Sequence, residues 1–393
     1  FFLRNQIVNL LNVSDPELFV KLFIPIVFSQ TFFFIGAILM SFQYFKNDFR
    51  YAAAAPVIYN SSIIFFGWLY SSSPESTVYG FAIGGLIGSV IGHFFIQIIG
   101  AKKNGLSFKL LKPKGKHILQ YMTISLPLIV GQSIAVVDEQ LFRYFGSFLT
   151  TGSIASFRYA RRVALIPVGV VAQAVGVASY PTLSNLYVEN KLEDFKLLVR
   201  KQLSVLALIN TGVLVLFVVN SENIITLIYQ RGLFTGEDTT RVSEIFLIVS
   251  FGLIPWSVNQ IVTRSYYVQR SYWFPVWVGT SITIVTIIIL KLNSAPTEAS
   301  YAAIIVSSLW LNMLVLSAFL KVKEERIVNK SQMLDFLKIF LVGTAVYFLV
   351  INIDIYSGNL IFEVIFDSLI ILILILMSLF VVKMKYINLK RIK

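Results

Sequence analysis

Long hydrophobic stretches alternate along this chain with short polar or charged connections. About 20 mostly apolar residues are needed to cross the roughly 30 Å hydrocarbon core of a bilayer. By that measure the sequence predicts an all-α polytopic membrane protein, with residues 1–12 as the end of a preceding helix. Eleven spanning helices are expected, over residues 19–41, 51–71, 78–100, 120–148, 153–180, 201–220, 241–267, 273–291, 299–320, 334–352 and 359–382.

The composition supports a membrane protein. Of the 393 residues, 56% are hydrophobic and 13% are charged, whereas soluble domains contain about 25% charged residues. The net charge of +13 comes from lysines and arginines between apolar stretches, which favours contact with lipid headgroups over nucleic acid. The chain has no cysteine, and His93 and His117 lie far apart in sequence. We therefore expect no disulfide, no metal site and no cofactor.

Lysines and arginines are distributed unequally over alternate connections. One set of connections contains most of them, including six lysines between residues 102 and 116 and five basic residues between 383 and 393. The other set contains little beyond Arg231, Arg241 and Lys291. Since cytoplasmic loops are enriched in lysine and arginine, we expect the first set, and with it the C-terminus, to be cytoplasmic.

The segment 101–118 is the longest strongly basic connection and predicts a boundary between two helical lobes. It also suits a topology anchor that touches anionic lipid. The expected organisation is three helices of an N-terminal lobe (1–100), a basic cytoplasmic linker (101–118), a six-helix lobe (119–320), and two additional helices with a basic tail (321–393).

Two further patterns concern packing and the membrane surface. Gly80, Gly84, Gly88 and Gly92 recur on one helix face, and such a stripe lets a neighbouring backbone approach closely. The stretches 184–200 and 221–232 are amphipathic and are expected to lie at the membrane surface. Four tryptophans suit interfacial belts: Trp68, Trp256, Trp273 and Trp277.

Ionisable residues gather in one predicted hairpin, formed by the helices over 120–148 and 153–180. Each charge costs about 2.5–3.5 kcal/mol near a bilayer centre, so such residues usually face a bundle interior or a wet cavity. Because the connection around residue 151 is short, the two helices must be antiparallel neighbours. Reflection about that residue places Asp138 level with Val163 or Ala164, close to Arg161 and Arg162. On the first helix, Glu139 and Arg143 are spaced for an i,i+4 ion pair.

These charges leave two interpretations open, since arginine is in excess over carboxylate. In the first, the carboxylates and arginines pair with one another and the surplus arginines reach the membrane surface by snorkelling. In the second, the surplus arginines bind an anionic ligand. Guanidinium groups suit phosphate, and a diphosphate matches the excess. The candidate ligand-binding residues are Arg143, Arg158, Arg161, Arg162 and, as a second cationic position, Arg264. Asp138 and Glu139 are expected to tune this charge or to bind an ion.

Helix-breaking residues occur in the same helices. They form hinges or simply kink packing helices, and the candidate hinges are Pro127, Pro167, Gly169 and Pro255. A phosphate-binding glycine-rich loop, a nucleophile elbow and a clustered metal site are all absent from the sequence. We therefore do not expect an enzyme.

Several short motifs, in one order along most of the chain, resemble the MurJ/MviN lipid II flippases of the MOP exporter superfamily. They are Gly36-Ala37-Ile38-Leu39, Phe49-Arg50-Tyr51, Ala55-Pro56-Val57, Gly152-Ser153-Ile154, Tyr159-Ala160, Pro181-Thr182-Leu183-Ser184, Gln230 to Phe234 with Glu237-Asp238-Thr239, and Arg264-Ser265-Tyr266-Tyr267 up to Pro275.

The resemblance implies a MATE-like bundle of two lobes around a cationic cavity, with two added C-terminal helices forming a groove for the lipid tail. It further implies alternating access in the bacterial cytoplasmic (inner) membrane. The cargo would be an undecaprenyl-diphosphate-linked disaccharide-pentapeptide, used in peptidoglycan and cell wall biogenesis. The expected partners are this lipid-linked diphosphate and membrane lipids, with the protein as a monomer.

The chain departs from the family pattern at several points. Its helices match the family's fourth to fourteenth, so the first three are not expected in it. Arg162 matches the family's arginine after Tyr-Ala-Asp, but Arg161 replaces the aspartate. Asp138 resembles the acid of the family's sodium site, whereas Thr286 and Leu290 stand where asparagine and aspartate are expected. Two alternatives stay open: a flippase for another lipid-linked saccharide, and a non-transporting scaffold that docks cell-wall synthesis proteins.

Overall fold

The computed structural model describes residues 16–107, 115–135, 137–352 and 359–381. The chain divides into two compact units, residues 1–113 and 114–393, and the division falls inside the basic 101–118 segment. The expected helical end at residues 1–12 and the basic C-terminal tail lie outside the described residues.

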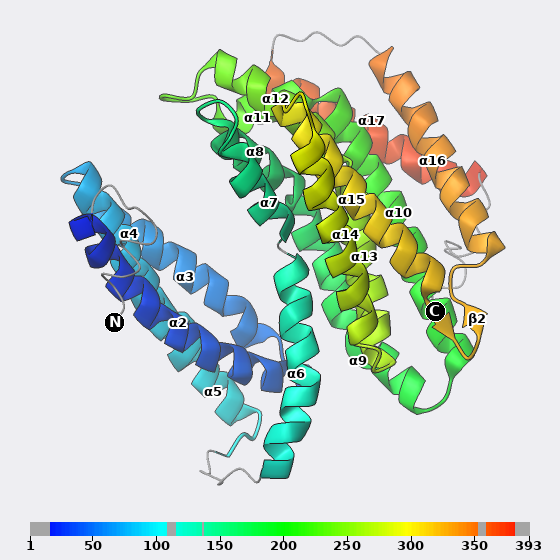
Figure 1. The fold of residues 1–393 in the computed structure, drawn as a ribbon, viewed down its shortest axis with the longest axis horizontal. Coiled ribbons are helices and arrows are strands. Elements are labelled where there is room, and N and C mark those ends of the chain that lie inside the picture. Colours follow the sequence, from blue (N-terminus) through cyan, green and yellow to red (C-terminus); the bar gives the residue numbers. More distant parts are fainter. Residues whose placement is uncertain (1–15, 108–114, 136, 353–358, 382–393) are drawn as a thin grey trace. The chain divides into compact units, whose positions relative to one another are not determined.

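The described part of the first unit, residues 16–107, contains three long helical segments (Figure 1). Helix α2 (Pro16–Phe45) is followed by α3 (Arg50–Leu69), and the third segment joins α4 (Pro74–Gly88), a π-helical turn η1 (Ser89–Phe95) and α5 (Ile96–Lys103). Ser73 caps α4 in a capping box with Ser76, and Pro74 occupies the first turn, where its missing N–H costs nothing.

The glycine stripe packs α4 and η1 against α3, as the sequence predicted. A Cβ atom on Gly84 would lie 2.6 Å from the Ser62 carbonyl oxygen, and one on Gly88 would lie 2.9 Å from the Tyr59 Cα atom. Neither distance leaves room for a side chain. The small residues therefore set how closely these two helices approach.

The second unit contains the remaining helices (Figure 1). They are α6 (Gly115–Ala135), α7 (Val137–Gly146), α8 (Ser153–Ala164), π-helical η2 (Val168–Ala172), α9 (Gln173–Val188), α10 (Leu192–Val219), α11 (Ser221–Tyr229), α12 (Gly236–Ser250), α13 (Leu253–Val268), α14 (Trp273–Leu292), α15 (Glu298–Phe319), α16 (Lys330–Ile351) and α17 (Leu360–Val381). A small antiparallel hairpin, which the sequence did not predict, joins α15 to α16; its strands are β1 (Lys321–Val322) and β2 (Glu325–Arg326).

Within the described residues, nine helical segments are long and apolar enough to cross a membrane, or ten when the bent pair α8 and η2–α9 counts as one. The expected helix over 120–148 accounts for the difference from eleven, since neither of its described pieces, α6 and α7, qualifies by itself. Large apolar side chains such as Phe340 and Phe348 on α16 are exposed, as expected for a surface that faces lipid.

The candidate hinges differ in their local structure. Pro127 lies inside α6, which continues through it. Pro167 and Gly169 lie at the junction of α8 with η2 and α9, where the axis bends by 44°. Pro255 lies in the first turn of α13, immediately after α12 ends, so the expected helix over 241–267 has two parts.

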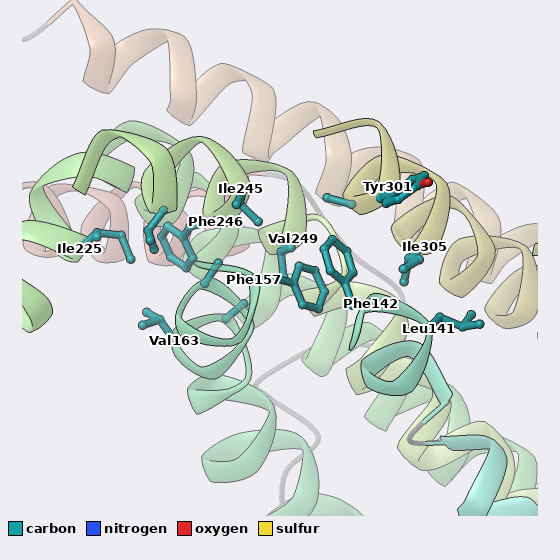
Figure 2. Close-up of a cluster of buried hydrophobic side chains, with 14 of the residues drawn as sticks. Leu141, Phe142, Phe157, Val163, Ile225, Ile245, Phe246, Val249, Tyr301 and Ile305 are labelled. Atoms are coloured by element: carbon teal, nitrogen blue, oxygen red, sulfur yellow. The ribbon is translucent and has the colours of Figure 1, made fainter. Parts of the chain in front are cut away.

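Both stretches expected at the membrane surface pack in part against protein. In 184–200, Phe195 and Val199 are fully buried in the core beside α13. In α11, Ile224 and Ile225 are buried against α8 and α12, in the hydrophobic cluster of Figure 2. The helix bundle thus covers part of each apolar face, while Val188 and Leu227 are exposed.

One hydrophobic cluster holds the charged hairpin in place (Figure 2). Phe142 of α7 stacks on Phe157 of α8, and both rings are buried beside Val249 and Ile305 of α12 and α15. The polar residues of α7 and α8 lie on the other faces of these two helices. A second apolar contact places α16 and α17 along α10.

Candidate functional site

Arg161 is the central residue of the charged hairpin. Its Nε and Nη2 atoms donate to the two oxygens of Asp138 at 3.0 and 3.1 Å, and Nη1 donates to Glu139 Oε2 at 3.3 Å. The Asp138 carboxylate is buried, with 6% of its side chain exposed. The guanidinium group also lies over the Trp256 ring, 5.6 Å from its centroid. The expected proximity of Asp138 to Arg161 is thus confirmed, whereas no contact joins Asp138 to Arg162 among the described residues.

Arg158 and Arg162 lie on one face of α8, and Arg161 lies beside that face. The three arginines line a pocket of about 470 Å³, together with Glu139, Ala155, Tyr159 and Leu165. We call this the arginine pocket. Arg158 and Arg162 are exposed in it, and neither forms an ion pair with any described residue. The pocket thus presents two guanidinium groups that are free to bind an anion.

Arg161 also lines a second pocket of about 370 Å³, inside the second unit. Its walls come mainly from α7, α13, α14 and α15, and its polar lining includes the carboxamides of Gln173, Asn259, Gln260 and Asn312. We call this the amide pocket. Arg264 lies at its edge and also lines a smaller pocket of about 160 Å³ with Tyr180 and Tyr267.

The remaining sequence predictions have mixed outcomes. Arg143 is exposed on α7 and lines neither pocket. The expected Glu139–Arg143 pair is not formed between these described residues, because Glu139 faces Arg161 on α8. Trp256, expected in an interfacial belt, lines the amide pocket beside Arg161 instead.

The amide-bearing residues are the main part of the site that sequence reasoning missed. Asn259 and Gln260 are adjacent carboxamides in the middle of α13, and Asn312 is the carboxamide of the largely apolar α15. Polar groups at membrane depth usually face a bundle interior or cavity, so their positions carried a usable signal.

Arg241 on α12 forms a separate polar cluster at the tip of the hairpin. It pairs with Glu298 of α15, and Nη1 donates to the Thr151 carbonyl oxygen at 3.0 Å. Its Nη2 atom donates to the hydroxyls of Thr150 and Ser153 at 2.7 and 3.1 Å. The turn passes through Gly152 at φ +93°, a conformation that favours glycine. Arg241 therefore fixes the turn between α7 and α8.

The chain resembles solved and curated proteins over much of its length. It is 25% identical over 280 residues to a probable lipid II flippase MurJ of Vibrio cholerae serotype O1, covering 70% of this chain and 52% of that protein. It is also 26% identical over 273 residues to a probable lipid II flippase MurJ of Helicobacter pylori, covering 63% and 56%. The chain thus spans about half the length of the curated relatives it matches.

A solved structure shows the same fold. It is lipid II flippase MurJ in an inward closed conformation, which matches with a TM-score of 0.68 and 24% identity, over 89% of this chain and 71% of that one. The described helices and these relatives indicate a multi-pass bacterial membrane protein. The family model described as lipid II flippase MurJ matches residues 12–377, and the chain therefore belongs to the MurJ family.

Proposed function

We propose that this chain acts as a flippase for lipid II, the polyprenyl-diphosphate-linked precursor of peptidoglycan. It moves this lipid across the bacterial cytoplasmic membrane by alternating access, with its C-terminus in the cytoplasm. The observation that carries the proposal is the pair of exposed guanidinium groups, Arg158 and Arg162, in the arginine pocket of a chain from this family.

The chemistry of the arginine pocket suits a diphosphate. A guanidinium group donates two parallel hydrogen bonds to a phosphate, and Arg158 and Arg162 offer one such group for each phosphate. Arg161 lies beside them, but its charge is offset by Asp138 and Glu139, which hold it in place. Arg264 provides a further cationic position in the amide pocket. The role is transport, since these residues bind and position a lipid without reacting with it.

The residues at the position of the family's sodium site do not fit a cation. Both oxygens of Asp138 already accept hydrogen bonds from Arg161. The Leu290 side chain has no oxygen atom that could coordinate a cation, and it is buried in the apolar cluster. The Thr286 hydroxyl donates a hydrogen bond to the Ile282 carbonyl oxygen at 2.8 Å. We therefore propose no sodium-dependent step in this protein.

Replacement of Arg162 tests the proposal. In the full-length protein, Arg162→Ala should abolish rescue of a strain depleted of its own lipid II flippase, because one phosphate-binding group is lost. Growth and protein level in the membrane are the measurements. Arg231→Ala, a change at an exposed arginine outside both pockets, is the matched control and should support normal growth.

Normal growth of the Arg162→Ala strain at normal protein level would overturn the proposed role. A scaffold for cell-wall synthesis proteins predicts that outcome, and also that purified protein does not bind lipid II. A flippase for another lipid-linked saccharide predicts that the wild-type chain fails to rescue the strain but binds a different polyprenyl-diphosphate saccharide.

A further inference from the structure

The amide pocket has a lining unlike that of the arginine pocket. The charges of Asp138 and Arg161 neutralise each other at one end. Apart from this pair and Arg264, the polar lining is uncharged and consists of carboxamides and hydroxyls, and Trp256 and Tyr267 supply aromatic surface. Such a lining suits a neutral ligand with many hydrogen-bonding groups and some apolar surface.

The hydrogen-bonding groups of this lining are largely unused. Asn259 Nδ2 donates to Asn312 Oδ1 at a long distance of 3.5 Å, and the buried Asn259 Oδ1 has no partner. The side-chain amides of Gln173 and Gln260 form no hydrogen bond with any described residue. Because buried polar atoms in folded proteins are almost always paired, the unpaired Asn259 Oδ1 is available for a ligand. The side chains of the exposed Gln173 and the half-buried Gln260 can also reach a ligand.

The size and position of the pocket narrow the choice of ligand. Its volume of about 370 Å³ is near the lower end of the roughly 300–1,000 Å³ found for small-molecule sites. Arg161 lines both pockets, so a group bound in the amide pocket lies next to a diphosphate bound by Arg158 and Arg162. In a lipid-linked saccharide, the diphosphate joins a polyprenyl chain to a sugar, and of these two groups only the sugar suits a lining of carboxamides and hydroxyls.

We propose that the amide pocket binds the saccharide of the lipid-linked substrate. This inference rests on the proposed function. Carboxamides both donate to and accept from sugar hydroxyl and acetamido groups, and the C–H face of a sugar ring packs on the Trp256 indole. The arginine pocket recognises the diphosphate that all such lipids share, and the amide pocket recognises the saccharide attached to that diphosphate.

Binding of three lipids to the purified full-length protein tests the inference. The lipids are undecaprenyl diphosphate, undecaprenyl diphosphate with the disaccharide alone, and complete lipid II with its pentapeptide. Asn259→Leu and Asn312→Leu keep the approximate side-chain size and remove the carboxamide. Each should weaken binding of both glycosylated lipids about tenfold, as expected for the loss of one or two hydrogen bonds, and change binding of undecaprenyl diphosphate less than about twofold.

Two further variants complete the experiment. Ser257→Ala removes a buried hydrogen bond between α13 and Asn210 of α10, outside the amide pocket, and should leave the binding of all three lipids unchanged. Arg162→Ala should weaken all three lipids alike. If Asn259→Leu does not fold, as judged by size-exclusion chromatography, Asn312→Leu provides the same test.

The outcomes separate the two proposals. Failure of the wild-type protein to bind any of the lipids overturns the proposed function. The saccharide site alone is overturned if the lipids bind and Arg162→Ala weakens them, but the two asparagine variants lower all affinities equally or not at all. It is also overturned if only complete lipid II loses affinity, because the pocket then holds the peptide.

Discussion

Arginine residues contact the α7–α8 hairpin at two levels and have opposite surroundings there. At the tip, Arg241 donates hydrogen bonds to Glu298, two hydroxyls and a main-chain carbonyl. About two turns further along α8, Arg158 and Arg162 are exposed in a pocket and have no ion-pair partner among the described residues. Arg161 lies beside them but binds two carboxylates.

The difference shows how structure assigns roles to identical side chains. A guanidinium group has five N–H donors. Where carboxylate and carbonyl oxygens accept them, the arginine joins elements of the fold, as Arg241 joins α12, α15 and the hairpin turn. Where the donors face a pocket, the arginine can bind an external anion. The following predictions separate the stability contributions of the paired and unpaired groups.

The largest effect on stability is expected for Arg161→Ala. This change leaves the buried Asp138 carboxylate without its cation, and breaking a buried ion pair in this way costs about 3–5 kcal/mol. Denaturation of the detergent-solubilised protein with sodium dodecyl sulfate measures the loss in free energy of unfolding. The double variant Arg161→Ala with Asp138→Asn should recover much of it, since no unpaired charge remains. An equal loss in single and double variants would contradict this account of Arg161.

A smaller effect is expected for Arg241→Ala. The half-buried Glu298 and the hairpin turn lose their charged donor, and a hydrogen bond to a charged group contributes about 1.5–3 kcal/mol. The same denaturation measurement applies. Arg162→Ala is the matched control on the unpaired side of the comparison, and as an exposed residue it should change stability by less than about 0.5 kcal/mol. Equal losses in the two variants would remove the distinction between paired and unpaired arginines.

The smallest effect on stability is expected for the ion pair of Lys196 with Glu325 at the β1–β2 hairpin. Lys196, buried on α10, forms ion pairs with Glu193 and Glu325. The neighbouring Lys196 ammonium lowers the pKa of Glu325 below its usual value. Since the pKa is lower in the folded state, this contribution to stability is present above the unfolded pKa and is lost as pH falls through the folded pKa.

We therefore expect a slight additional loss of thermal stability on acidification, which the Glu325→Gln variant should not show. Because Glu325 is exposed, the pair is screened by solvent and its effect is small. If acidification lowers the thermal stability of Glu325→Gln as much as that of the wild type, the Lys196–Glu325 pair does not contribute to this pH dependence.

The sequence predicted the helical spans well where hydrophobic stretches were continuous. The expected helices over 51–71 and 273–291 correspond to α3 and α14 within two residues at each end. The sequence did not predict the surroundings of a helix whose apolar face is shared between lipid and protein. The faces of 184–200 and 221–232 looked suitable for a membrane surface, but packing inside the bundle buries them, and periodicity alone does not distinguish the two environments.

The candidate site was predicted in part. The free-energy cost of charges in a membrane and the short turn at residue 151 together predicted that Asp138 lies beside Arg161. The short turn makes the two helices antiparallel neighbours, and this determines which residues of one helix lie opposite which residues of the other. The same reasoning could not show that Glu139 would select Arg161 over Arg143, since both are within reach of its side chain. It also could not find the amide pocket, whose walls come from helices far apart in the sequence.

The sequence by itself thus determined the membrane class, most helical spans and the hairpin in which charge is concentrated, because hydropathy and insertion cost are local properties. Only the tertiary structure decided which arginines are paired and which remain free to bind a ligand. That distinction depends on acceptors supplied by other helices, such as Glu298 for Arg241, and their distances are set by packing of the whole bundle.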